Sequence, residues 1–195
     1  MWDARLGNQR IGGDLAIAVN PTDSRIVYLA WAALEASVYT LHLRRSTDAG
    51  VTWSANDLRA KAAALNPALA VNARGKVAFL YQQVTGTGAS RRWVTTVERS
   101  PDGGRTWQSN VLANVPATTP EPQFQPYLGD YIGMTSVGND FFGIFSANNS
   151  PDPTRFPSGV VYQRNHDFQT RRLFDVDGTT QIAVSIDPFF FRISE

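Results

Sequence analysis

The sequence predicts an all-β protein: a β-propeller of four-stranded antiparallel blades, with about three blades plus partial blades in this chain. Three observations support this. Short runs rich in Val, Ile, Tyr, Phe and Thr alternate with Gly, Pro, Asn and Asp, which is typical of strands joined by tight turns. A unit of about fifty residues occurs three times. One turn sequence is written twice, as RRSTDAGVTW and ERSPDGGRTW, 54 positions apart.

Eight short runs are predicted to be strands. They read LAIAV, IVYLAW, VYTLHL, KVAFLY, RWVTTVE, FFGIF, GVVYQ and IAVSI. The exception is Asp57 to Leu65, DLRAKAAAL, whose composition favours a helix but whose length allows only a short helical turn or a loop.

The repeats define the blades. Each copy has the same short pattern at the repeated turn: an Arg, then a Ser, then an Asp two residues later. The three copies are Arg45-Ser46-x-Asp48, Arg99-Ser100-x-Asp102 and Arg164-Asn165-x-Asp167, and the third is degenerate because Asn replaces Ser. Four strands fit a unit of this length, and radially repeated four-stranded sheets are propeller blades. The expected single propeller region, residues 1–195, divides into a partial blade at 1–10, blades at about 11–60, 61–118 and 119–178, and a partial blade at 179–195 that opens a further copy.

Composition excludes several classes of function. The 195 residues include 18 basic and 17 acidic ones, so a net charge of +1 gives no field that would favour nucleic acid or an anionic membrane. There is no cysteine and there are only two histidines, which argues against disulfides and zinc sites, and we expect no metal and no cofactor. No run of eighteen apolar residues predicts a membrane span. The N-terminal residues lack the apolar run of a signal peptide, and the compartment stays unknown.

The repeated turn has a physical explanation as scaffolding. Its short Asp can accept hydrogen bonds from backbone amides exposed by the bend, its Gly supplies a positive φ, and its Trp buries a large ring between neighbouring sheets. Both turns share the pattern Ser-x-Asp-x-Gly-x-Thr-Trp, at residues Ser46, Asp48, Gly50, Thr52 and Trp53 and at residues Ser100, Asp102, Gly104, Thr106 and Trp107. This pattern resembles the Asp-box, or bacterial neuraminidase repeat (BNR), of sialidase-like propellers. The resemblance implies a structural role for these ten residues and a six-bladed ring of which this chain is a part.

If the blades are correct, functional groups are expected at the mouth of the central channel, where the innermost strands begin. Asp14 and Asp130 occupy equivalent places there. Two carboxylates at one mouth can be the acid and the base or nucleophile of a glycosidase. They can equally cap backbone amides at the start of a strand.

Other polar and aromatic residues are expected around the same mouth. The proline-held stretch Pro120 to Met134 carries Glu121, Gln125, Tyr127 and Tyr131, and the faces of its aromatic rings suit a sugar. Three further residues are candidate ligand contacts, with an Arg able to grip a carboxylate: Arg10, Asn148 and Arg155. Each of these side chains can instead hold its own loop.

Resemblance to the sialidase-like family extends over most of the chain at the level of repeats. It implies an exo-α-sialidase-like glycoside hydrolase, or the later half of one, with Asp130, Tyr131, Glu121 and Asp14 as catalytic candidates. The Arg-Ile-Pro signature of the family is absent, since Arg10-Ile11-Gly12 shares two letters with it and lacks the proline. The alternative is a non-catalytic carbohydrate- or protein-binding propeller. Both functions imply a glycan or glycoconjugate as partner. The ring is expected to be completed by a homodimer, or the chain is a fragment of a longer one. That longer chain would be secreted or at the cell surface if it carries a signal peptide.

Overall fold

The computed structural model describes residues 14–120, 127–129 and 131–195, and the fold of these residues is all-β. Fifteen strands form four antiparallel sheets, and the described residues include no α-helix, only two short 3-10 turns at Gly88–Ser90 and Pro153–Arg155. None of the described segments is a helix long and apolar enough to cross a bilayer. The all-β prediction is therefore confirmed.

The first two sheets are meanders in which each strand pairs with the next along the chain. The first sheet contains β1 (Leu15–Val19), β2 (Val27–Glu35), β3 (Val38–Ser46) and β4 (Arg59–Ala62). The second contains β5 (Ala64–Val71), β6 (Val77–Thr85), β7 (Arg92–Ser100) and β8 (Gln108–Pro116). Both match the four-stranded units that the repeats predict.

The third sheet is assembled differently. Its order is β11-β15-β10-β9, from β9 (Gly133–Val137), β10 (Asp140–Asn148), β11 (Val161–Tyr162) and β15 (Ile186–Ile193). A small fourth sheet joins β12 (Asn165–Asp167), β13 (Arg172–Phe174) and β14 (Gln181–Ile182). Residues 179–195 were expected to open a further unit, but β15 instead completes the third sheet. The reason is packing, because Phe189 and Phe191 alternate on β15 and are buried against the second sheet.

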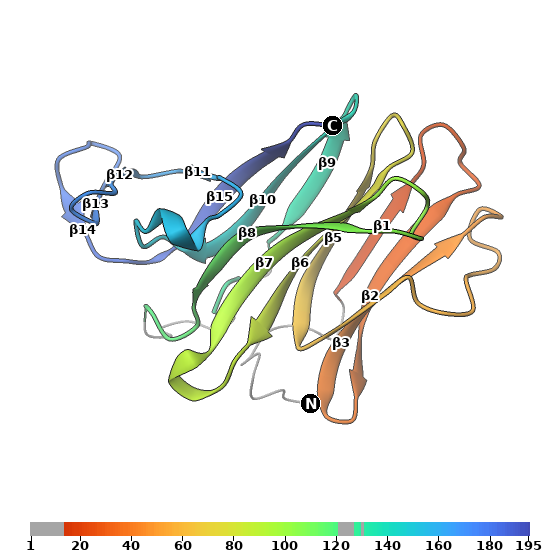
Figure 1. Cartoon of the computed structure of the whole chain (residues 1–195), viewed down its shortest axis with the longest axis horizontal. Helices are drawn as coiled ribbons and strands as arrows, with labels where there is room; N and C mark the ends of the chain where they lie inside the picture. Colours follow the sequence, from red (N-terminus) through yellow and green to blue (C-terminus); the bar gives the residue numbers. More distant parts are fainter. Residues whose placement is uncertain (1–13, 121–126, 130) are drawn as a thin grey trace.

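The three four-stranded sheets follow one another with the second in the middle. Their first strands, β1, β5 and β9, lie in contact in that order, and Figure 1 shows the sheets in sequence from the red strands to the blue ones. One buried cluster fills the space between the first two sheets, with Tyr28, Leu43 and Phe79 among its members. Another lies between the second and third sheets. The sheets of the described residues do not close into a ring.

The segment expected as a helical turn or loop is strand instead. Arg59–Ala62 forms β4, and Ala64 begins β5. Alanine favours helices in isolation, but β4 pairs with β3 over four residues, and the larger sheet overrides this local preference. Ala63, which separates the two strands, has a φ of 53° and allows the chain to leave one sheet and enter the next.

Candidate functional site

Strand register places the expected site and the repeated turns at opposite ends of the sheets. Val19, the last residue of β1, pairs with Val27, which pairs with Ser46 at the beginning of the first turn. Leu15, the first residue of β1, therefore lies at the other end. The start of β1 is thus remote from the turn, as the sequence predicts.

Asp14 and Asn66 join the sheets at the end where the strands begin. The carboxylate Oδ2 of Asp14 accepts a hydrogen bond from the backbone N–H of Asn66 in β5 at 2.9 Å. The side-chain Nδ2 of Asn66 in turn donates to the carbonyl oxygen of Gly129, just before β9, at 3.2 Å. One asparagine therefore connects the start of the first sheet to the start of the third, and Tyr131 follows Gly129 by two residues.

A buried polar chain continues inward from Asn66. Its Nδ2 also donates to Gln82 Oε1 at 2.8 Å. The Nε2 of Gln82 donates to Thr95 Oγ1 at 3.1 Å and to the carbonyl oxygen of Ser146 on β10 at 2.8 Å. Since Asn66, Gln82 and Thr95 are all buried, these bonds satisfy groups that would otherwise destabilise the fold. Sequence reasoning missed this chain, although residues 16–20 (AIAVN) and 68–72 (ALAVN) repeat at an offset that aligns Asn66 with Asp14.

Two residues of the proline-held stretch have different environments. The Tyr131 side chain is 84% exposed and extends into solvent. Tyr127 is half-buried, its hydroxyl donates to the carbonyl oxygen of Pro120 at 3.0 Å, and burial raises its pKa to about 12. Of the two, only Tyr131 has a ring face available to a ligand.

The other described candidates are engaged in contacts within the chain. Asn148 is buried, its Nδ2 donates to the carbonyl oxygen of Thr119, and its Oδ1 accepts from the amide of Ser150. Arg155 Nε lies 3.4 Å from Asp152 Oδ2. The pKa of Asp152 lies below its usual value, chiefly because the Thr154 hydroxyl donates to it. Arg155 therefore pairs within its own loop, whereas Asn148 also links its loop to Thr119, just after β8.

Four candidates lie outside the described residues. They are Arg10, Glu121, Gln125 and Asp130. The expected pair of Asp14 and Asp130 therefore stays a prediction. Among the described residues, no three His, Cys, Asp or Glu side chains converge as metal ligands would.

The two repeated turns have the same internal hydrogen bonds. In the first, Asp48 accepts from the Ser46 hydroxyl at 2.7 Å and from the Thr52 amide at 2.8 Å, and the Gly50 amide donates to Ser46 Oγ. The second turn has the corresponding bonds at Asp102. The hydrogen bond from the following threonine is the main reason that the pKa of each aspartate falls to about 2. These carboxylates stabilise the turns.

The two tryptophans are half-buried rather than enclosed between sheets. The Trp107 ring packs against the cluster between the first two sheets, and the guanidinium carbon of Arg59 lies 5.0 Å from its centroid. The Trp53 ring lines a pocket beside the turns and contacts the position of Gly50. Trp107 therefore packs on the cluster between the first two sheets, whereas Trp53 lines the pocket beside the turns.

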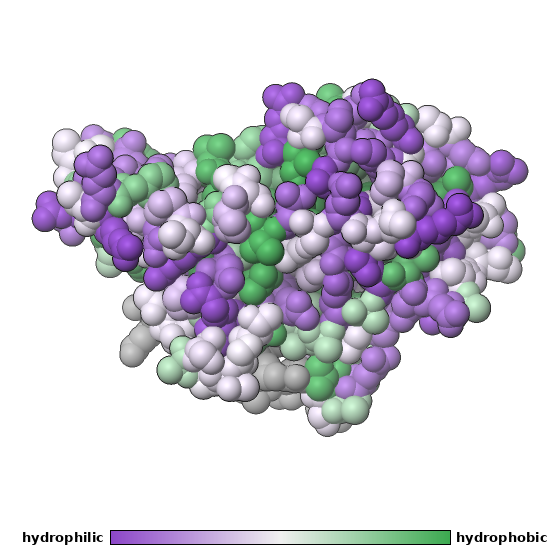
Figure 2. Space-filling model, viewed as in Figure 1, coloured by the Kyte–Doolittle hydropathy of each residue, from purple (hydrophilic) through white to green (hydrophobic). Residues whose placement is uncertain are grey.

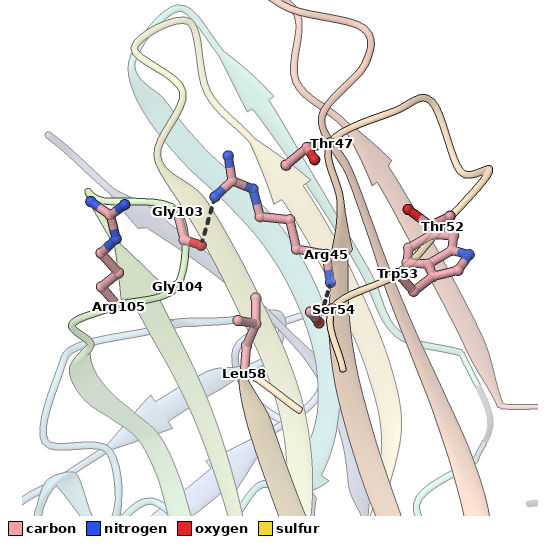
Figure 3. A pocket seen from close by; sticks show the side chains of 9 residues that line it. All are labelled: Arg45, Thr47, Thr52, Trp53, Ser54, Leu58, Gly103, Gly104 and Arg105. Atoms are coloured by element: carbon pink, nitrogen blue, oxygen red, sulfur yellow. Dashed lines mark hydrogen bonds between the residues drawn. The ribbon is translucent and has the colours of Figure 1, made fainter. Parts of the chain in front are cut away.

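A pocket of about 370 Å³ lies between the two turns (Figure 3). Arg45 extends across it and its Nη1 donates to the carbonyl oxygen of Gly103 at 3.5 Å, while Trp53 and Arg105 lie on opposite sides of Arg45. Leu58 packs so close to Gly104, where φ is 100°, that an added Cβ would come within 2.6 Å of its Cδ1. The pocket is thus a seam where the first two sheets meet, and its side chains do not converge on a common point.

His42 lies between two carboxylates, one at each ring nitrogen, on the side of the first sheet that carries Trp31. His42 Nδ1 lies 2.7 Å from Asp57 Oδ2, and its Nε2 lies 3.3 Å from Glu35 Oε1. The imidazole stacks on Trp31 at 5.0 Å. Burial raises the pKa of Asp57, but hydrogen bonds from His42 and Arg44 outweigh this effect, so the net shift is downward. The register places His42 opposite Trp31, which in turn pairs with Leu15, so the cluster lies level with the start of β1 and two strands away from it. It includes no predicted site residue.

No protein-family model matches the sequence, and no curated protein is significantly similar to it.

Proposed function

We propose that the three four-stranded sheets are successive blades of a sialidase-like, Asp-box β-propeller. Three features support the proposal: β1, β5 and β9 lie in contact in order, the first two sheets are four-stranded meanders, and two turns with matching hydrogen bonds follow the third strand of each. In such a ring, the strand starts surround the mouth of the channel. Asp14, Asn66 and Gly129 would then lie around that mouth.

The function that we propose for this mouth is glycan binding without cleavage. The observation that carries the proposal is the contact of Asp14, whose carboxylate accepts the Asn66 amide at 2.9 Å and so holds two sheets together. This contact is the amide-capping alternative for Asp14, whereas a catalytic carboxylate must also reach substrate through its remaining acceptor sites. Arg155 likewise pairs with Asp152, whereas the exposed ring of Tyr131 is available for a sugar to stack on.

The second candidate is a sialidase-like glycoside hydrolase. It is favoured by the exposure of Tyr131, which directly follows Asp130 at the end tied to Asp14 through Asn66. In that case Asp130 and Glu121 would supply the acid and the base or nucleophile. The two candidates make different predictions for the same protein.

Glycan-array binding and glycoside cleavage, measured on the full chain, separate them. For a binding module we expect retention of acidic or neutral glycans and no release of fluorophore from a sialoside or from a panel of other glycosides. Replacing Tyr131 by Ala should weaken binding about five-fold, since a stacked ring contributes about 1 kcal/mol. Tyr131→Phe, which keeps the ring, should retain most of the affinity.

The outcomes that contradict the proposal are distinct. Cleavage that is lost in Asp130→Asn would establish the hydrolase and rule out a purely binding role. If the protein neither binds nor cleaves any glycan tested, both candidates are ruled out. Equal binding by wild type and Tyr131→Ala would remove the strand-start end as the glycan site. The exposed Val176, far along the chain in the β13–β14 loop, provides a control variant, Val176→Ala, that should bind as wild type does.

A further inference from the structure

The first strands of the first two sheets have the same sequence pattern but different burial. Residues 16–20 read AIAVN and residues 68–72 read ALAVN. Leu69 and Val71 are 7% and 5% exposed, whereas Ile17 and Val19, at the matching positions, are 65% and 48% exposed. Equivalent apolar side chains thus lie in a core in one sheet and in solvent in the other.

The cause of this difference is a missing neighbour. Leu69 and Val71 belong to the buried cluster shared with the preceding sheet, and the alanines between them face the following sheet. Ala16 and Ala18 likewise pack toward the following sheet, against the same cluster. Ile17 and Val19 therefore point to the side on which β5 has a preceding sheet as its neighbour. Among the described residues, no sheet precedes β1 on that side.

This uncovered face extends beyond β1. Leu15 lies on the same side of the strand as Ile17 and is also exposed. The register places it opposite Trp31, and places Ile17 opposite Leu29. Trp31 and Leu29 are half-buried, so apolar side chains continue across two strands. We name the side chains of Leu15, Ile17, Val19, Leu29 and Trp31 the leading face.

The third sheet has an uncovered apolar face at the other end of the series. On β10, Phe141 and Phe145 are buried against the second sheet, whereas Phe142 and Ile144 point the other way, and Ile144 is 50% exposed. Ile144 pairs with Phe190 of β15, which pairs with the exposed Val161 of β11. A shallow depression of about 350 Å³ lies among these side chains. We name the side chains of Phe142, Ile144, Val161 and Phe190 the trailing face.

The two faces lie on opposite sides of the sheet series rather than on its outer edge. Figure 2 shows that the edge turned toward the viewer is mostly hydrophilic, with hydrophobic residues in smaller patches. Contiguous exposed apolar surfaces of this kind mark interaction sites. A partner that presents a sheet face fits such surfaces, because the exposed side chains extend across paired strands.

We propose that the leading face of one chain binds the trailing face of a second copy, and that two such contacts close a dimer. The chain already makes the same kind of contact within itself, since the preceding side of the second sheet packs on the following side of the first. The leading face corresponds to the side of the second sheet that packs on the first sheet. The trailing face corresponds to the side of the first sheet that packs on the second sheet. The two exposed faces are therefore the two complementary halves of that contact. In a head-to-tail pair related by a two-fold axis both halves are used twice, and none stays exposed. The proposal depends on sheet packing and not on glycan binding.

Light scattering and sedimentation of the full chain test the proposal directly. We expect a mass twice that of the 21.5 kDa chain, falling to the monomer on dilution. Ile17→Lys and Ile144→Asp should each raise the Kd at least ten-fold, because each places an unpaired charge in both contacts. Both residues are exposed in the single chain, so thermal unfolding of the monomer should be nearly unchanged. Val176→Lys is the matched control for an exposed apolar residue elsewhere.

Mixing the two charged variants gives the sharpest test. In one contact of a mixed dimer, the lysine introduced on the leading face of one chain meets the aspartate introduced on the trailing face of the other. The second contact keeps both wild-type isoleucines, so the mixture should dimerise more tightly than either variant alone.

Three results would overturn the proposal. The first is a monomer for the wild type at every soluble concentration. The second is growth into filaments, which open head-to-tail contacts produce. The third is a dimer sensitive to Ile17→Lys but not to Ile144→Asp, because that result indicates like faces in contact.

Discussion

Replacement of Asn66 by Ala would measure how strongly polar contacts at the strand starts hold the sheets together. The Asn66 side chain donates one hydrogen bond to Gln82, which lies in the same sheet, and one to Gly129, which precedes the third sheet. Alanine removes both. The bond from the Asn66 backbone amide to Asp14 would survive, because the substitution does not change the backbone donor.

The expected cost can be worked out from these contacts. Each lost hydrogen bond has a net value of about 1 kcal/mol, and Gln82 Oε1, which is buried, would lose the Asn66 donor at a further cost of about 1 kcal/mol or more. Asn66 also has a φ of 54°, in the left-handed region that Asn tolerates better than Ala. Together these effects should lower the free energy of unfolding by about 2–4 kcal/mol.

Urea unfolding followed by tryptophan fluorescence provides the measurement. With a slope of about 2 kcal/mol per molar urea, the midpoint should fall by about 1–2 M. Asn66→Gly is the informative control, since it removes the same amide but accepts the positive φ without strain. A midpoint for Asn66→Ala within about 0.3 M of the wild type would refute the argument that the asparagine stabilises the junction.

Two further predictions concern packing and acid stability. Gly143→Ala should destabilise the fold by about 1–3 kcal/mol in thermal or urea unfolding, because the new Cβ would lie 2.5 Å from the Phe191 ring, whereas Gly133→Ala meets only ordinary contacts and should be nearly neutral. A loss as large for Gly133→Ala would contradict this explanation. The pKa values of Asp48 and Asp102 are lowered from 3.8 to about 2 in the folded state, so the stability that they contribute is present above pH 4 and is lost as the pH falls toward 2. Urea midpoints measured across that window should fall less steeply in Asp48→Asn than in the wild type, and equal slopes would contradict the assignment.

Seven of the eight predicted runs overlap observed strands because their signal is local, whereas IAVSI, at 182–186, lies mainly between β14 and β15. Short runs rich in β-branched, aromatic and other apolar residues in β2, β3, β6 and β7 are typical of strands that pack on both faces. The prediction for the segment at β4 is wrong because its alanines favour a helix, and its strand state depends on pairing with β3. Such pairing is not visible in the segment itself. The assembly of the third sheet is missed for the same reason, since β15 joins β10 across some forty residues.

The candidate site is harder to predict because it depends on contacts between sheets. Asp14 has two alternatives, catalysis or capping of a backbone amide, and composition cannot choose between them. The choice depends on whether an N–H lies within reach, and the N–H in question belongs to Asn66, 52 residues away in sequence. The repeats do contain a usable signal, because they align Asn66 with Asp14. Asp14 and Asn66 occupy the same repeat position, at the start of β1 and of β5. A contact repeated from sheet to sheet explains both residues, whereas a catalytic role would explain only Asp14.

That explanation also accounts for why the exposed faces and the polar junctions occur on the same strands. β1 and β5 each have a polar residue near the start, Asp14 and Asn66, that contacts the next sheet, and both strands are apolar along most of their length. β5 has both neighbours and is buried at all eight positions, whereas β1 and β9 have alternately exposed residues. The apolar residues of β1 are therefore suited to a contact that the described residues do not themselves complete. The strand retains the side chains that such a contact needs, and this is the physical basis for expecting a second copy at the leading face.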